Sequence, residues 1–580
     1  MGTDVNQGRI IRHLNAYLEK QNLPFRMNKT GVCNGLAALH AEYALKGELG
    51  KFQNILKFIA DGTKVEGISE EDIDRFAVRV AATFDPKKYN LKLRQTNAIE
   101  MLSVNGHALK SSFDLALVAN DKNWESVFQE LALKNNEVMQ VSSVNHAISI
   151  QKINNVYAVY DPNYSEGYKY FSNEKDLVKE LHSNVFTFSG KNMGLQLQVI
   201  RHPEDLKDRP FPEVTSIYDR FLPDVNAVAF TGDQKFTTLS FAAWDNDGSI
   251  IDYLLKRKPT DIWDAIGSAI VNNNPRALRA LLPEINDKDK RYSCIKQTLE
   301  HGRKEAFEVL MQDQEISASY NKMLVRYDDE NNVFNISDIA YAAKGGNPEL
   351  LQYCIEQRIN HLIARAMPDD KTISEEVREA AAAPIKKNLS ERISEAILAY
   401  RGKPNDPLLN AVKSGSKGTV QVLVEQLHKT NHQLSDTDKI KYLREAISNN
   451  HFHVASYLIS EKPAISPEML NSIQMSTLAV ERTNIALLNL LKTEGMTFSS
   501  AAQKIIDSKN KGSLTFIESL SVAVAKFTDF FKDNLSNREE RGVKYDPKLF
   551  KQMKERMQEV KSNIVDLKDS SLPEIIPLTF

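Results

Sequence analysis

Residues 341–355 read YAAKGGNPELLQYCI, and three of their positions decide the fold of the C-terminal half: Ala342, Gly346 and Cys354. A small residue such as Ala342 lets two helices approach each other closely. Gly346 can take the left-handed conformation that ends the first helix and starts a turn. Cys354 stands eight residues further on, where an apolar side chain would be buried in a second helix. The stretch therefore predicts two helices joined by a tight turn.

This register recurs seven times along the chain, with a small residue, Gly or Asn four positions later, and an apolar residue eight positions after that. The copies are Ala242, Asn246, Leu254; Ala269, Asn273, Leu281; Thr298, Gly302, Leu310; Ala342, Gly346, Cys354; Ala411, Gly415, Leu423; Ala446, Asn450, Leu458; and Leu478, Arg482, Leu490. Only Arg482 departs at the turn, in the last copy, where a terminal repeat is expected to be atypical.

The opening of the first copy, TTLSFAA at 237–243, resembles the TPLHxAA start of an ankyrin repeat, with Thr238 and Ser240 replacing proline and histidine. Successive copies start 27 to 69 residues apart, against ~33 in a regular ankyrin array, so two gaps hold insertions. The larger insertion, at 371–400, predicts a pair of helices that protrude from the stack. We therefore expect an all-α ankyrin-repeat solenoid over 237–500, with a helical insertion near 356–406.

The regions on either side of the array complete the expected domain organisation. Four prolines among charged residues, Pro203, Pro210, Pro212 and Pro223, indicate a semi-rigid connector at 203–236. A separate N-terminal domain would then occupy residues 1–202. Residues 501–580 include two segments with helical apolar spacing and predict a C-terminal helical cap and tail.

Composition narrows the function classes. The chain has 580 residues, 42% hydrophobic residues and a net charge of -2, so no strong basic or acidic surface points to nucleic acid. No stretch approaches the ~20 apolar residues of a membrane span. Cys33, Cys294 and Cys354 are too few for a disulfide framework and lack the spacing of a zinc site, so we expect no metal or cofactor and a reducing compartment. Cys294 and Cys354 fit best as buried core residues.

Cys33 is the catalytic candidate of the N-terminal domain. It lies in NKTGVCNGLAALHAEYALKG at 28–47, whose apolar residues recur with helical spacing, so Cys33 would begin a helix. The unpaired N–H groups and the dipole at a helix start favour the thiolate, which is the nucleophilic form. Gly35 would keep the surface beside the sulfur clear for a substrate backbone.

Residues 144–164, VNHAISIQKINNVYAVYDPNY, predict two strands joined at Asn154 and Asn155. A two-residue hairpin pairs positions whose numbers sum to 309, which makes His146 and Asp161 diagonal neighbours roughly 7 to 8 Å apart at the backbone. Asp161 would orient the imidazole, and His146 would take the thiol proton and return it to a leaving group. His40 and His107 are competing bases. His40 would lie about two turns along the nucleophile's own helix, and His107 has no adjacent acid.

This order of residues resembles the papain-like effector proteases of bacterial pathogens, of the YopT and AvrPphB type, over about residues 1–200. The resemblance implies an α+β papain-like cysteine protease domain with Cys33 as nucleophile, His146 as base and Asp161 as orienting acid. Papain-like enzymes carry an oxyanion-hole glutamine about six residues before the cysteine. Here Met27 stands at that position, and the nearest amide, Asn28, would take the role.

A papain-like domain joined to divergent ankyrin repeats also resembles the ankyrin-repeat effectors that Legionella delivers through its type IV secretion system. The resemblance implies a protein that acts inside a host cell, in the cytosol or the nucleus, and binds a host protein through its repeats. Two alternatives stay open. The same three residues could serve a deamidase or acyltransferase, or the papain-like domain could be non-catalytic and the whole chain a scaffold.

Overall fold

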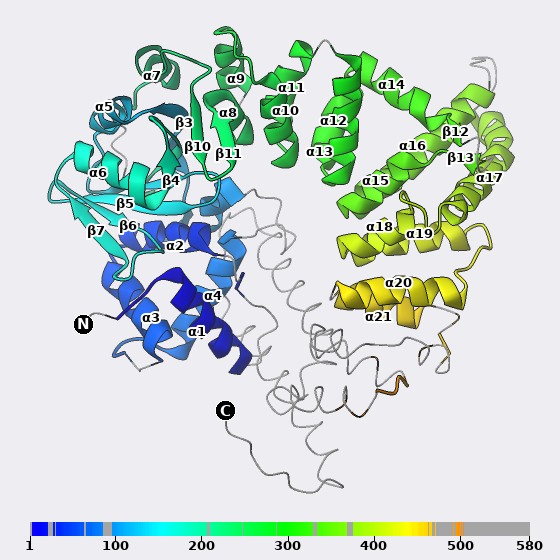
Figure 1. Ribbon diagram of the computed structural model, residues 1–580, viewed down its shortest axis with the longest axis horizontal. Coiled ribbons are helices and arrows are strands. Elements are labelled where there is room, and N and C mark those ends of the chain that lie inside the picture. The colour runs from blue at the N-terminus through cyan, green and yellow to red at the C-terminus, as the bar shows by residue number, and fades with distance from the viewer. Residues whose placement is uncertain are drawn as a thin grey trace, which may run out of the picture. The chain divides into compact units, whose positions relative to one another are not determined.

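In a computed structural model, the described residues of the chain divide into two compact units, one within residues 1–265 and one from residue 266 onward. The structure describes residues 3–20, 27–28, 31–62, 65–84, 95–205, 209–245, 248–285, 287–328, 333–367, 375–449 and 451–461, and a few positions from there to 503. It combines many helices with a six-stranded sheet, so the expected multidomain α+β architecture is confirmed at that level (Figure 1).

An antiparallel sheet in the order β3-β9-β4-β5-β6-β7 forms the frame of the first unit. Its strands are β3 (Ser111–Asn120), β4 (Glu137–Ser142), β5 (Ala147–Ile153), β6 (Val156–Tyr160), β7 (Tyr168–Phe171) and β9 (Asn192–Arg201). A two-stranded ribbon, β1 (Ser103–Val104) and β2 (His107–Ala108), follows the 3-10 turn Gln95–Met101. The central strands are buried on both sides, since helices cover both faces.

One group of helices, α1 (Gln7–Lys20), α2 (Cys33–Leu45), α3 (Leu49–Asp61) and α4 (Glu70–Phe84), encloses an apolar core of buried side chains. Within it, α2 packs directly on β4 and β5. On the other side of the sheet lie α5 (Asp121–Leu131), α6 (Glu174–Glu180) and the π-helical turn Leu181–Val185 (Figure 1). The indole N–H of the fully buried Trp124 donates to the carbonyl of Met193 at 2.8 Å and joins α5 to β9.

Residues 203–236, expected to be a connector, pack as part of this first unit. They supply α7 (Val214–Phe221), β10 (Val228–Thr231) and most of β11 (Gln234–Thr237), and β10 pairs with both β11 and β8 (Phe188–Ser189). Tyr218 is fully buried and its hydroxyl donates to the carbonyl of Ala116 at 2.8 Å. Phe236 lies so close to Gly194 that a Cβ there would meet its ring at 2.3 Å. The prolines do not keep this segment apart from the first unit, because the aromatic side chains of Tyr218 and Phe236 are buried in it.

The predicted boundary near residue 202 therefore differs from the observed division after Ala265. The first predicted repeat, which corresponds to α8 (Thr238–Asp245) and α9 (Gly248–Leu255), falls in the first unit. Its α8 is attached to the sheet, since the hydroxyl of Thr238 accepts a hydrogen bond from the backbone N–H of Val118 at 2.9 Å.

The second unit is built from helix–turn–helix pairs. The pairs are α10 (Ile262–Val271) with α11 (Pro275–Leu281), α12 (Lys288–Glu300) with α13 (Lys304–Gln312), α15 (Ser337–Gly345) with α16 (Pro348–Ala366), α18 (Pro407–Ser414) with α19 (Lys417–His428), and α20 (Asp436–Ser448) with α21 (Phe452–Ser460). The first helices stack in the order α12, α15, α18, α20, and the second helices pack in a parallel layer. The units of the predicted repeat are thus present as pairs of helices.

The turn residues of these pairs confirm the predicted register. Asn273, Gly302, Gly346 and Gly415, the four that the structure describes, all have positive φ, between 53° and 74°. The apolar position of each described copy is fully buried, including Cys354 in place of leucine. Asn246, Asn450, the whole last copy at 478–490 and the expected cap at 501–580, apart from Gln503, lie outside the described residues.

The insertion at 371–400 differs from the predicted pair of helices. Its described part is one continuous helix, α17 (Glu375–Ala399), which contains Pro384, and the neighbouring helix is an extension of α16 to Ala366. The shorter insertion, between α13 and α15, holds α14 (Gln314–Leu324) and the ribbon of β12 (Tyr327–Asp328) with β13 (Val333–Phe334). Pro384 does not end α17, although a proline removes one helical hydrogen bond.

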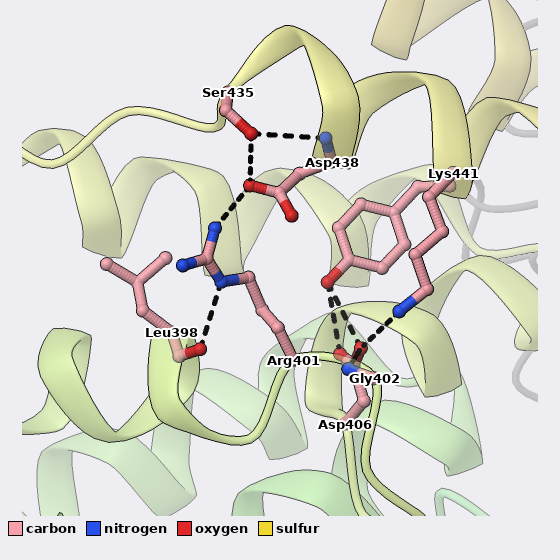
Figure 2. Close-up of polar contacts among 8 residues, drawn as sticks. Leu398, Arg401, Gly402, Asp406, Ser435, Asp438 and Lys441 are labelled. Carbon is pink, nitrogen blue, oxygen red and sulfur yellow. Dashed lines mark hydrogen bonds and ion pairs between the residues drawn. The ribbon is translucent and has the colours of Figure 1, made fainter.

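Asp406 fixes the end of this insertion to the two helix pairs that follow it (Figure 2). Its fully buried carboxylate caps α18 through the N–H of Leu409 at 3.0 Å and accepts from Gly402 N–H at 2.8 Å. The hydroxyl of Tyr442, from α20, donates to the same group at 3.1 Å. Beside it, Arg401 pairs with Asp438, the residue whose N–H is capped by Ser435. One acid thus connects the end of the insertion, α18 and α20.

We expect opposite effects from two glycine-to-alanine changes in this unit. Gly346→Ala should destabilise it by about 1–2 kcal/mol, because φ is +70° there and a Cβ makes the left-handed region unfavourable. Gly267→Ala, in the middle of α10, should stabilise it by about 0.5–1 kcal/mol, because the added methyl group would meet only open space. Urea unfolding followed by circular dichroism measures both. Equal effects of the two changes would contradict the turn assignment.

A second expectation concerns the unit boundary. A fragment of residues 1–202 should be poorly folded, because it leaves the sites of Tyr218 and Phe236 on the sheet uncovered, whereas residues 1–265 should give a folded monomer. Circular dichroism and size-exclusion chromatography of the two fragments test this. A monomeric, cooperatively folded 1–202 fragment would restore the boundary predicted from the prolines.

Candidate active site

Cys33 is the first residue of α2, as predicted. The preceding residue, Val32, is non-helical (φ -138°, ψ 28°) and provides no side-chain cap to the helix. From Gly35 onward nearly the whole helix is buried between α4 and the sheet. Cys33 itself is partly exposed, in contrast to the fully buried Cys294 and Cys354. A rigid, buried helix therefore holds an accessible thiol at its positive end.

Gly35 has a different role from the one expected. It is buried against α4, where a Cβ would lie 2.4 Å from the carbonyl oxygen of Val80. The glycine thus permits the close crossing of α2 and α4, and it does not line the surface beside the sulfur. The correction follows from helix geometry, since residues two apart face different sides of a helix.

The hairpin that carries the other two candidates has the predicted register. Strands β5 and β6 pair with Ser149 opposite Tyr160 and Ile153 opposite Val156, and Asn154 and Asn155 form the turn with φ of 50° and 66°. Positive φ at both central residues is the pattern of a type I′ turn. His146 comes directly before β5 and Asp161 directly after β6, so both stand at the same end of the hairpin.

The structure brings Cys33, His146 and Asp161 together. His146 Nε2 lies 2.8 Å from Asp161 Oδ1, and both side chains are more than nine-tenths buried. Cys33 lies close enough to the imidazole to help raise the pKa of His146. Because Asp161 occupies Nε2, Nδ1 is the nitrogen left for the thiol. The three predicted site residues thus lie together, with His146 interacting with both the thiol and the carboxylate.

The electrostatics of the site favour a charged imidazole. Burial by itself lowers the pKa of His146, but the hydrogen bonds to Asp161 and Cys33, reinforced by the negative charges of both partners, raise it from 6.5 to about 9. Near neutral pH the ring is therefore an imidazolium, which is the form that stabilises a thiolate beside it and can donate a proton to a leaving group.

Two further residues surround His146 and were not singled out in the sequence. The ring of Phe186 packs edge-on against the imidazole, with centroids 5.9 Å apart. The backbone N–H of Asn163 donates to Asp161 Oδ1 at 2.8 Å, which makes an Asx-type turn. Asn163 follows Asp161 by two residues, the spacing at which an aspartate often accepts the later backbone N–H, whereas Phe186 comes from a distant segment that no local pattern indicates.

The competing bases lie elsewhere. His40 is fully buried on α2, with Nδ1 2.9 Å from Ser149 Oγ and its ring stacked on Tyr160, and burial lowers its pKa to about 3. It therefore stays neutral and faces the sheet. His107 is an exposed residue of β2, opposite Val104.

The assignment of Asn28 as a candidate oxyanion donor is still a prediction from the sequence. Its side chain is exposed, and its carbonyl accepts a 3.4 Å hydrogen bond from Gly31 N–H.

Across the described ranges, no three His, Cys, Asp or Glu side chains gather as a metal ion would need. In the same ranges, no helix has the length and apolar character to cross a membrane.

Compared with models of known protein families and with curated proteins, the chain matches neither a family model nor a curated sequence. The functional interpretation therefore rests on the geometry of Cys33, His146 and Asp161.

Proposed function

We propose that this chain is a thiol hydrolase of the cysteine protease type, joined to an ankyrin-type helical-repeat module that binds a host protein. The observation that carries the proposal is the grouping of Cys33 with the hydrogen-bonded pair of His146 and Asp161, with a partly exposed thiol at a helix start. The resemblance to bacterial effectors extends the proposal to a protein that a type IV system delivers into a host cell.

The reaction follows from the charges of the three groups. The Cys33 thiolate attacks a carbonyl carbon, a C–S bond forms, and the carbonyl electron pair moves to oxygen. When the tetrahedral intermediate collapses, the bond to the leaving amine breaks and the amine takes the proton of the His146 imidazolium. His146, now neutral, removes a proton from water, which attacks the thioester and releases the acid. Asp161 stabilises the imidazolium throughout and does not take its proton.

The repeats supply a second, separate activity in this proposal. Stacked helix pairs present extended surfaces made of many similar units, which suit a macromolecular partner better than a small ligand. Binding through such a surface would bring one protein to the thiol, so that recognition need not come from the pocket beside Cys33. A deamidase or an acyltransferase would use the same acyl-enzyme, and the acceptor of the acyl group distinguishes them.

We expect one cysteine to react in the folded protein. A limiting amount of iodoacetamide should alkylate Cys33 and spare Cys294 and Cys354, which are fully buried. Burial also raises the pKa of Cys294 to about 12 and that of Cys354 further. Peptide mapping by mass spectrometry gives the modified positions. Equal labelling of the three cysteines in native buffer would contradict the proposal.

The rate at which iodoacetamide alkylates Cys33 at pH 6 should depend on His146 and on no other histidine. His146→Ala should slow it about tenfold or more, because the imidazolium that favours the thiolate is then missing. Asp161→Ala should have a smaller effect, since it acts through the imidazole. His182→Ala is a matched control, because buried His182 forms a separate pair with Asp121.

An experiment in host cells separates the enzyme proposal from the scaffold alternative. If Cys33→Ser abolishes the effect of the protein on the host cell, the enzyme proposal is supported. If Cys33→Ser keeps the full effect and still binds the partner, the scaffold alternative is supported.

Stability should also depend on pH through His146. Its pKa is raised on folding from 6.5 to about 9, so its contribution is complete below pH 6.5 and is lost as the pH rises through 9. The first unit should therefore lose stability across this range, and His146→Ala should reduce that loss. Urea unfolding followed by tryptophan fluorescence measures it, since Trp124 and Trp244 lie in this unit and Trp263 lies on α10, at its boundary. An identical pH dependence in both proteins would contradict the charge assignment.

A further inference from the structure

The N-terminal segment before α1 lies along the turn that follows Asp161. The N–H of Val5 donates to the carbonyl of Ser165 at 2.7 Å, and the N–H of Gln7 donates to the carbonyl of Pro162 at 2.5 Å. These backbone bonds bring the first residue of α1 to the acid side of the site. They join segments more than 150 residues apart in the chain.

The side chain of Gln7 continues from this turn to the nucleophile side. Its Oε1 accepts the backbone N–H of Val32 at 3.1 Å, and its Nε2 donates to Asn163 Oδ1 at 2.5 Å. A backbone N–H can only donate, so the atom of the Gln7 amide that faces Val32 must be the oxygen, and the nitrogen must face Asn163. Gly31 makes room for it, since φ there is +148° and a Cβ would lie 3.3 Å from Oε1.

Each end of the Gln7 amide contacts a residue that lies next to one of the three site residues. Val32 directly precedes Cys33 in the chain. At the other end, the N–H of Asn163 donates to Asp161 Oδ1, the same oxygen that holds His146, and Asn163 Nδ2 lies 3.4 Å from His146 Nε2. The sulfur comes from the helix layer and the histidine and acid from the hairpin. Gln7 thus spans two elements whose relative position sets the distance from sulfur to imidazole.

We propose that Gln7 is a positioning residue of the active site, which holds the Cys33 helix start at hydrogen-bonding distance from His146 by bridging Val32 and Asn163. The inference rests on the proposed thiol chemistry. Misplacement of reacting groups by about 1 Å can reduce rates about a hundredfold, so a single amide between the two elements is enough to matter. Gln7 does not touch the reacting atoms and acts through Val32 and Asn163.

The alternative is that Gln7 only anchors α1, and Arg9 provides the matched comparison. Arg9, two residues further along the same helix, anchors α1 to the end of α3, where it donates to the carbonyl of Ala60 and pairs with Asp61, both at 3.1 Å. Arg9→Ala therefore weakens the attachment of α1 without touching the amide bridge. A purely structural role predicts similar effects from Arg9→Ala and Gln7→Ala.

The test is the rate of Cys33 alkylation by iodoacetamide from pH 5 to pH 10, measured in the full chain and its variants. Gln7→Ala should slow alkylation at pH 6 about tenfold and shift the profile of rate against pH toward that of His146→Ala, because the imidazolium no longer lies in place beside the sulfur. Gln7→Glu, which keeps the acceptor for Val32 but cannot donate to Asn163, should shift the profile in the same direction. Arg9→Ala should leave the profile unchanged.

The outcomes separate the two proposals. If wild type and His146→Ala share one profile, the thiol hydrolase proposal fails and the role of Gln7 fails with it. If they differ but Gln7→Ala and Gln7→Glu both match wild type, or Arg9→Ala produces the same shift as Gln7→Ala, only the positioning role is overturned. Tryptophan fluorescence verifies that each variant is folded, and Gln7→Glu decides the matter if Gln7→Ala does not fold.

Discussion

The hydrogen bond between His146 Nε2 and Asp161 Oδ1 is the contact on which the rest of the site depends, and a two-residue turn at the opposite end of the hairpin makes it possible. Asn154 and Asn155 both have positive φ, which fixes the register of β5 and β6. A slip of one residue would place the imidazole and the carboxylate on opposite faces of the sheet. The charge of the imidazole and its orientation toward the thiol both follow from this register.

The features that could be predicted from the sequence are those determined by neighbouring residues. The turn at Asn154 and Asn155, the helix that begins at Cys33 and the left-handed turn residues of the repeats all follow from local backbone preferences and periodicity. The features that could not be predicted depend on contacts between distant segments. Composition alone indicated a connector at 203–236, whereas Tyr218 and Phe236 find their partners only on the folded sheet.

Two glycines show the same distinction. Gly346 has its predicted conformation because a turn needs it locally. Gly35 is required by the carbonyl of Val80 on another helix, and no local rule indicates that.

In the repeats, buried polar groups add a similar nonlocal constraint. Asp338 pairs with the equally buried Arg358, and Asp406 accepts a hydrogen bond from Tyr442, so a shifted helix would leave a buried charge without its partner.

The turns between paired helices also explain where the chain has changed in length. A Cβ on Gly345 would lie 2.1 Å from the carbonyl of Leu299, so adjacent turns meet backbone to backbone. Both described insertions, the one with α14 and the one with α17, occur on the other edge, between the second helix of one pair and the first helix of the next. Extra residues at the turns would push neighbouring repeats apart, whereas the other edge can lengthen without disturbing the stack. That edge is the place where this array can acquire new surfaces while its core stays the same.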